Sequence, residues 1–94
     1  MGKSILFSDT TQCAICGSPY VEIHHIFYGT ANRRHSEKLG YVIPLCYKHH
    51  RGSQEGIHFN KNMAVYYKRI AQTHFEDNLG NRDDFINRFG KSYL

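Results

Sequence analysis

The sequence predicts a small α+β domain, stabilised by zinc, with an antiparallel hairpin, one long C-terminal helix and a short terminal helix. Two cysteine-containing pairs, 13–16 and 46–49, have the spacing of metal ligands. Two segments rich in β-branched and aromatic residues adjoin them, and residues 61–78 carry a helical pattern of apolar side chains. We expect one domain over residues 1–94, because 94 residues are few for burying a core without a metal or disulfides.

The hairpin is predicted from residues 20–27 (YVEIHHIF) and 41–46 (YVIPLC), which read as strands. Pro44 has no N–H to donate, which favours an edge position or a strand end. The connecting segment 28–40 (YGTANRRHSEKLG) is polar and shows no helical period. It is therefore predicted to be a long exposed loop, and loops of such length are often functional.

The C-terminal part, residues 60–94, is predicted to be helical. Asn60 is a suitable N-cap for a helix over residues 61–78, and Gly80 suits its C-terminal end. One face of that helix collects most of the apolar side chains: Met63, Tyr67, Ile70, Ala71, His74 and Phe75. A short helix over 83–89 has two acids in its first turn and Gly90 just past its end.

A structural zinc site is predicted from four residues: Cys13, Cys16, Cys46 and His49. Three cysteines cannot complete a disulfide framework, but with one histidine they close a tetrahedral Cys₃His site. Such a closed site would pin the base of the hairpin and serve stability, not catalysis. The alternative is three unrelated cysteines with coincidental spacing.

Free cysteines favour a reducing, intracellular setting. The chain shows neither a signal-peptide pattern nor an apolar run long enough for a membrane span. These features predict a cytoplasmic protein that does not enter the membrane.

We call the four predicted zinc ligands the clamp. A second site is indicated by four histidines outside the clamp: His24, His25, His50 and His58. Neighbouring side chains of a strand point to opposite faces, so His24 can bind an ion while His25 approaches a substrate. His50 follows the clamp ligand His49, which fixes its place, and His58 can complete the set. Two or three histidines with open coordination positions are typical of catalytic metal sites. The alternative is that a histidine near a metal site has no role of its own. This is our interpretation of His35 and His74.

These residues carry a family resemblance over residues 13–58, the core motif. The Cys-x-x-Cys knuckle, the strand ending His24-His25-Ile26 and the block Pro44-Leu-Cys-Tyr-Lys-His-His50 are similar to HNH nucleases of the ββα-metal type. The segment from Gly56 and the C-terminal ending resemble small phage and prophage HNH proteins. Among these, the chain most resembles the recombination-enhancement, recombinase-dependent nucleases.

The resemblance implies an endonuclease that hydrolyses DNA phosphodiester bonds in phage recombination or DNA processing, with a recombinase as a candidate partner. By the same resemblance His25 is the general base that activates water. His24, His50 and His58 are then the ligands of a catalytic divalent ion, either Mg²⁺ or a transition metal.

Two positions depart from the family pattern. Tyr41 stands where the family usually has the asparagine that helps to orient the base, so what orients His25 is left open. The last histidine normally follows within one helical turn of His50, where this chain has Gln54. His58, eight residues after His50, is then the best candidate for this ligand, and we expect an ion site that is looser or that uses water in place of a ligand.

A net charge of +4 and a pI near 9.1 are compatible with nucleic acid but do not require it. The basic residues near the predicted site would contact phosphates without reading sequence: Arg33, Arg34, Lys38, Lys48, Arg51 and Lys61. An ordinary solvated basic loop is the alternative. The rival functions are a zinc-stabilised DNA- or protein-binding module without catalysis, which the missing asparagine favours, and a small zinc regulator of transcription.

Overall fold

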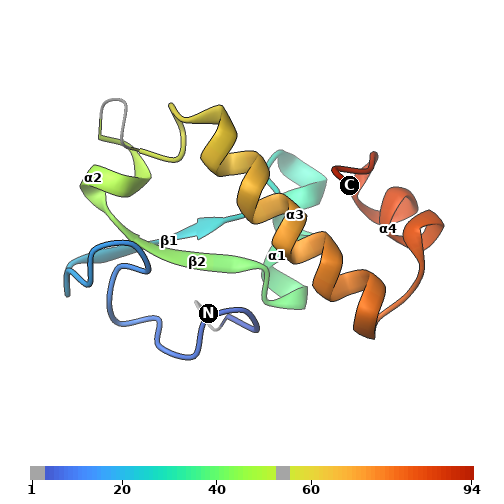
Figure 1. Ribbon diagram of the computed structural model, residues 1–94, viewed down its shortest axis with the longest axis horizontal. Coiled ribbons are helices and arrows are strands. Elements are labelled where there is room, and N and C mark those ends of the chain that lie inside the picture. The colour runs from blue at the N-terminus through green and yellow to red at the C-terminus, as the bar shows by residue number, and fades with distance from the viewer. Residues whose placement is uncertain (1–3, 53–55) are drawn as a thin grey trace.

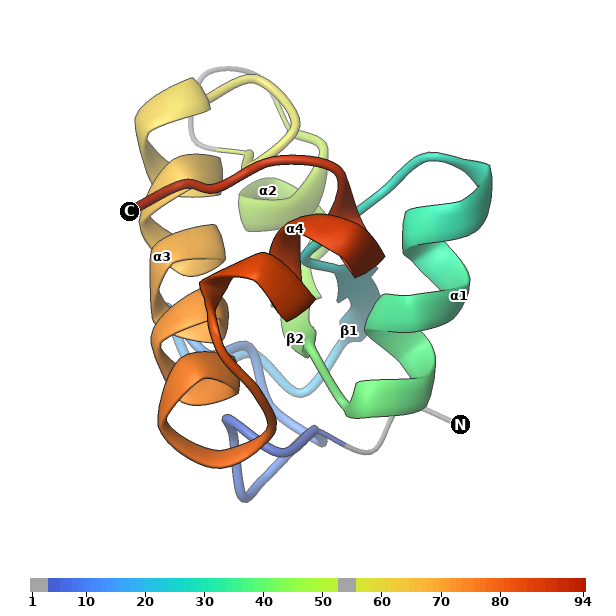
Figure 2. The same ribbon diagram turned by 90° about the vertical axis from the view of Figure 1, so that its right-hand side faces the viewer.

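The computed structural model describes residues 4–52 and 56–94 and has the predicted α+β class (Figure 1). Two antiparallel strands, β1 (Val21–His25) and β2 (Val42–Cys46), form a hairpin. Over these described residues four helices accompany it, in chain order α1 (Thr30–Leu39), α2 (Tyr47–His50), α3 (Lys61–Asn78) and α4 (Arg82–Phe89). The strands lie between α3 on one side and α1 on the other (Figure 2).

The hairpin pairs Val21 with Cys46 and His25 with Val42, so the metal-ligand end and the histidine end lie at opposite ends of the strands. Every residue of β2 is buried. Pro44 pairs with Ile23 in this two-stranded sheet, where each strand is an edge. The Pro44 carbonyl accepts a hydrogen bond from the Ala14 N–H at 2.9 Å, which ties the cysteine knuckle to β2.

The prediction of a loop over residues 28–40 is wrong, because Thr30–Leu39 form helix α1. Its inward-facing side chains are mostly polar, so the segment carries no hydrophobic period. Asn32 donates to the Phe89 carbonyl at 3.2 Å, and His35 packs edge-on against the Phe89 ring. The helix ends at Gly40, whose φ of 80° is left-handed, a conformation that glycine adopts without strain.

Ser36 holds α1 against the hairpin. Its fully buried hydroxyl donates to the Tyr41 carbonyl and accepts from the Phe27 N–H, so it satisfies backbone groups just outside both strands. The Tyr41 N–H in turn donates to the Ser36 carbonyl at 2.8 Å. These bonds join α1 to the chain on either side of it.

Helix α3 has the predicted bounds, and Asn60 caps it by accepting from the Met63 N–H at 3.0 Å. Its buried face differs partly from the predicted one, since Ala64 and Gln72 are buried as well. The Gln72 amide bonds Ser92 and the Tyr93 N–H, so this polar residue fastens the C-terminal tail.

Helix α4 starts one residue earlier than predicted, at Arg82. Asn81 and Asp84 form a capping box at its start, and Gly90 ends it in a left-handed conformation with φ 96°. Within the described residues, no helix is long and apolar enough to cross a membrane.

One hydrophobic core joins the helices to the cysteine end of the hairpin. Phe27 lies at its centre, with ring centroids 4.2 Å from Phe89 and 5.5 Å from Phe85. Cys13 and Cys46 belong to the same buried cluster. The candidate metal ligands are therefore continuous with the core.

Replacing Ser36 with alanine would leave the buried Phe27 N–H without its partner and break the bond to Tyr41. We expect Ser36→Ala to lower the free energy of unfolding by about 1–3 kcal/mol. Chemical denaturation of the metal-loaded protein measures this. Ser8→Ala, on an exposed residue, should change stability by less than about 0.5 kcal/mol. Equal effects of the two substitutions would contradict the role given to Ser36.

Candidate metal centres and active site

Four ligand atoms converge at the base of the hairpin. The Sγ atoms of Cys13 and Cys46 lie 3.7 and 3.3 Å from His49 Nδ1, and Cys16 Sγ lies 3.6 Å from Cys46 Sγ. All four ligand atoms are within 4.8 Å of one another. The cysteines are not paired as disulfides, which need sulfurs about 2.0 Å apart.

These separations suit one tetrahedral ion. With metal–sulfur bonds of about 2.3 Å and metal–nitrogen bonds of about 2.0–2.1 Å, tetrahedral edges are about 3.8 Å between sulfurs and about 3.6 Å from sulfur to nitrogen. The observed edges of 3.3–3.7 Å come close to these values without rearrangement. The four residues are therefore close enough together to bind a metal.

The chain places the four ligands through two short local structures. The knuckle turns at Gly17, where φ is 79° and the N–H donates to the Cys13 carbonyl at 2.9 Å. Cys46 ends β2 and is the N-cap of α2, so His49 follows within one helical turn on the same side.

Cys13 is also prepared as a thiolate. Burial by itself raises the pKa of the Cys13 thiol. This effect is outweighed by hydrogen bonds from the backbone N–H groups of Cys46, Cys16 and Ile15 and from the His49 side chain, and the pKa falls to about 6. A thiolate is the form of cysteine that binds metals.

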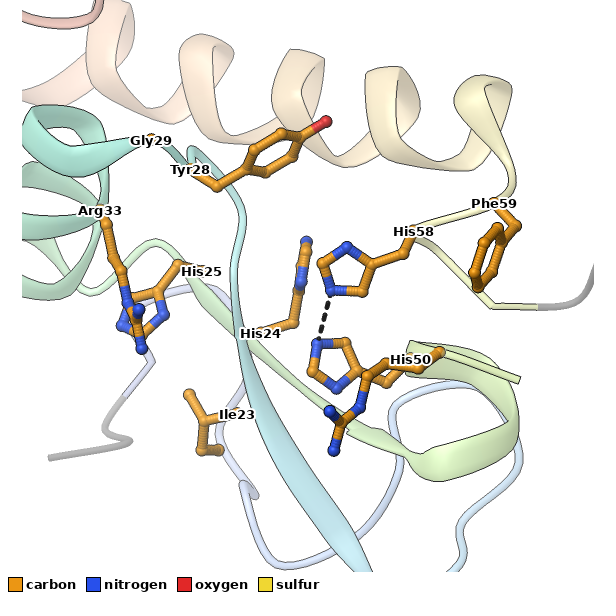
Figure 3. Close-up of a pocket in the computed structure, with 10 residues that line it drawn as sticks. Ile23, His24, His25, Tyr28, Gly29, Arg33, His50, His58 and Phe59 are labelled. Carbon is orange, nitrogen blue, oxygen red and sulfur yellow. Dashed lines mark hydrogen bonds between the residues drawn. The ribbon is translucent and has the colours of Figure 1, made fainter. Parts of the chain in front are cut away.

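A second cluster joins His24 on β1, His50 on α2 and His58 in the segment before α3 (Figure 3). The Nε2 atoms of His50 and His58 are 3.0 Å apart. The His24 ring lies with its centroid 5.2 Å from that of His50 and 5.0 Å from that of His58. One ligand atom from each of the three lies within 4.8 Å of the others.

The surroundings of His24 and His58 favour neutral imidazoles, which have a lone pair to give to an ion. His24 is 3% exposed, and burial, with His50 and His58 nearby, lowers its pKa to about 3. Burial lowers the pKa of His58 as well. Two nitrogens bound to one ion at about 2.0–2.1 Å lie about 2.9–3.4 Å apart, so the His50–His58 separation fits a shared ion.

Glu22 fixes the orientation of His50. Its Oε1 atom lies 2.6 Å from His50 Nδ1, and an ionised carboxylate can only accept, so Nδ1 donates. Hydrogen bonds from Arg51 and His50 lower the pKa of Glu22, which keeps it ionised. The remaining nitrogen of His50, Nε2, is the one that faces His58. Carboxylate-bound histidines of this kind are common at metal sites.

His25 lies on the other side of β1 from His24, as strand alternation predicts (Figure 3). Its Nε2 atom is 2.7 Å from Glu37 Oε1 on α1. His25 and the three-histidine cluster nevertheless open onto one pocket of about 800 Å³. The pocket is lined by Ile23, His24, His25, Tyr28, Gly29, Arg33, His50, Arg51, His58 and Phe59.

The structure divides the basic residues that the sequence grouped together. Arg33 and Arg51 line the histidine pocket, and Arg51 also donates to Glu22 at 2.7 Å. Arg34 and Lys38 instead line a separate groove formed with α3 and α4. Lys48 and Lys61 are exposed at the starts of α2 and α3.

Six residues of the site were not predicted. Four of them line the pocket, Ile23, Tyr28, Gly29 and Phe59, and the other two, Glu22 and Glu37, bond to His50 and His25. Glu22 precedes His24 by two residues in a strand, so alternation could have placed both on one face. Glu37 had no such signal, because its helix was predicted as a loop. Tyr41, where the resemblance implies an asparagine, is buried and its hydroxyl is bonded to His74 Nδ1 at 2.9 Å. The expectation about Gln54 lies outside the described residues.

Removing one clamp ligand should release the metal and unfold the chain, because the clamp and the core share residues. We expect Cys46→Ser to lose about one equivalent of metal per chain together with its helical circular dichroism. Elemental analysis and circular dichroism measure the two effects. Ile15→Ser, at an exposed knuckle position between two ligands, is the matched control and should keep both. A folded, fully loaded Cys46→Ser protein would show that the ligand set is wrong.

Glu22 can be tested separately from the clamp. Without its carboxylate, His50 is free to rotate, so Glu22→Ala should weaken metal binding at the histidine cluster by about 10- to 100-fold. Calorimetric titration of protein whose clamp is already loaded measures this affinity. Asp77→Ala, at an exposed carboxylate on α3, should leave it unchanged. Equal affinities of wild type and Glu22→Ala would remove Glu22 from the site.

Comparison with protein-family models, curated proteins and solved structures finds no match for this chain. We therefore base the function on the site itself. Its main features are the four-ligand clamp, the three-histidine cluster and the pocket that this cluster shares with His25.

Proposed function

We propose that this chain is a metal-dependent endonuclease of the HNH, ββα-metal type, which hydrolyses DNA phosphodiester bonds with little sequence preference. One observation carries the proposal: His25 and the cluster of His24, His50 and His58 open onto the same pocket. A base and an ion at one site are the two requirements of metal-assisted phosphodiester hydrolysis.

The order of elements supports the same assignment. A hairpin followed directly by a short helix, with His24 and His25 ending the first strand and His50 on the helix, is what the resemblance to ββα-metal nucleases implies. Helix α1 is then an insertion in the hairpin connection.

The clamp in this proposal holds a structural zinc ion. Its donor set of three thiolates and one imidazole is typical of structural zinc, and four protein ligands leave no open position for a substrate. Its contribution to function is indirect. By fixing His49 on α2, the clamp also fixes the next residue, His50, opposite His24.

The second site suits a transition metal better than magnesium. Its three ligands are imidazole nitrogens, whereas Mg²⁺ and Ca²⁺ prefer oxygen ligands. When bound, such an ion would offset the charge that develops on the phosphate and on the leaving oxygen.

The chain's own residues supply the remaining roles. His25 accepts the proton of the attacking water, a task for which imidazole is suited near neutral pH. Arg33 and Arg51, which line the pocket, would contact phosphate oxygens in this proposal. Phosphate contacts give affinity without sequence preference. Action on phage or prophage DNA, with a recombinase as partner, belongs to the same proposal and rests on the resemblance alone.

A zinc-stabilised binding module without catalysis is the second candidate. The observation that favours it is Tyr41, which replaces the family's asparagine and is bonded to His74 on α3. Such a module would bind DNA through the same basic residues but would not cut it.

Plasmid nicking separates the two candidates. With Zn²⁺, Ni²⁺, Mn²⁺ or Mg²⁺ added, wild-type protein should nick supercoiled plasmid, and His25→Ala should reduce the rate by about 10²- to 10⁴-fold because the base is lost. His35→Ala is the matched control, since His35 packs on Phe89 away from the pocket. Activity that survives His25→Ala would refute the catalytic assignment. Wild-type protein that binds DNA but never nicks it would favour the binding module.

A further inference from the structure

We propose that Glu37 is a positioning residue that sets the tautomer of His25, so that Nδ1 is the nitrogen that accepts the proton. This proposal rests on the proposed nuclease function. It assigns to a carboxylate on α1 the task that the family's asparagine performs at the position where this chain has Tyr41. Glu37 does not touch the substrate in this proposal and acts only through His25.

The direction of the hydrogen bond determines the tautomer. Glu37 Oε1 lies 2.7 Å from His25 Nε2. An ionised carboxylate has no hydrogen to donate, so the hydrogen of this bond must sit on Nε2. A neutral imidazole carries one N–H, and its lone pair is therefore on Nδ1. Without Glu37, either nitrogen could carry the hydrogen, and the ring could rotate about its Cβ–Cγ bond.

Helix α1 holds Glu37 firmly. The neighbouring Ser36 is fully buried and bonded to the Phe27 N–H and the Tyr41 carbonyl. Asn32, one turn earlier, is bonded to the Phe89 carbonyl. Three residues after Glu37, Gly40 ends the helix, and its N–H donates to the Glu37 carbonyl at 3.2 Å. Hydrogen bonds therefore hold the helix both before and after Glu37, and this fixes the point from which its carboxylate extends.

The other nearby candidates do not fit this role. The Tyr41 hydroxyl is bonded to His74 Nδ1 on α3. Arg33 shares the pocket with His25, but a guanidinium has no acceptor and cannot take a hydrogen from Nε2. The side chains of His25 and Glu37 are 15% and 37% exposed, so the pair is shielded on the histidine side and reachable from solvent on the other.

A purely structural role, in which the pair only fastens α1 to β1, is the alternative. It predicts that removing the carboxylate lowers stability and leaves the chemistry of His25 unchanged. The tautomer of His25 distinguishes the two, because a structural bond has no need to place the hydrogen on one nitrogen.

Long-range ¹H–¹⁵N spectra of the zinc-loaded protein report the tautomer directly. They are recorded at a pH of about 8.5, roughly two units above the ordinary histidine pKa of about 6.5, so that imidazoles are neutral. In wild type we expect His25 to carry its hydrogen on Nε2 alone. In Glu37→Ala we expect a mixture of the two tautomers. Glu37→Gln keeps the shape but can donate as well as accept, so it should also give a mixture.

Nicking kinetics supply the second readout. Glu37→Ala and Glu37→Gln should lower kcat by about 10²-fold, the lower end of what a general base contributes, with KM changed by less than about twofold. Asp77→Ala, which removes an exposed carboxylate on α3 outside the site, is the control for loss of negative charge. It should match wild type in both the spectra and kcat.

Each result decides the proposal. A His25 tautomer that is the same in wild type and in both Glu37 variants overturns it, and so does a changed tautomer with an unchanged kcat. If Glu37→Ala does not fold, the Gln variant gives the answer, because it keeps the volume and the hydrogen-bonding reach. If wild type never nicks DNA, the nuclease proposal fails, and the spectra alone then decide whether Glu37 positions His25.

Discussion

The geometry of the site depends on the junction between β2 and α2. Cys46 ends the strand and caps the helix, and His49 follows on the same helical turn. Their contact, 3.3 Å from Sγ to Nδ1, closes the ligand cluster with the knuckle. Because Cys13 and Cys46 also lie in the hydrophobic core, a metal bound there would stabilise the hairpin and the core together. In a chain of 94 residues, a bound metal would in this way compensate for a small buried area.

The chain has two pairs of adjacent histidines, and in each pair the backbone geometry directs the two side chains to different sides. In a strand, neighbouring side chains point to opposite faces, which separates His24 from His25. In a helix, neighbours differ by about 100° around the axis, which separates His49 from His50. The strand pair places one histidine in the cluster and leaves the other beside it. The helix pair links the clamp to the cluster through a single peptide bond.

The sequence predicted the hairpin, α3 and α4, whose buried faces are apolar. It missed α1, whose buried face is polar, and the four-residue helix α2, which has no buried residue. The bounds of α3 and its cap Asn60 followed from a regular apolar stripe and a strong capping residue. Helix α1 could not be found in this way, because Asn32, His35 and Ser36 make its contacts. The ligand clusters could be predicted, since metal sites constrain spacing along the chain. Partners such as Glu37 could not, because they depend on the placement of the missed helix.

Helix α1 also shows how the proposed site can work with Tyr41 at the position where the resemblance implies an asparagine. In the proposed assignment, an asparagine near the start of β2 would brace a hairpin whose connection is a loop. Here the connection is α1, braced by the Ser36 hydroxyl, and a carboxylate from that helix already reaches His25. Tyr41 is then free to serve the core, where its ring packs on Phe27 and its hydroxyl bonds His74. In the proposed assignment, helix α1 therefore takes over both tasks of that asparagine: the Ser36 hydroxyl braces the hairpin connection, and Glu37 holds His25.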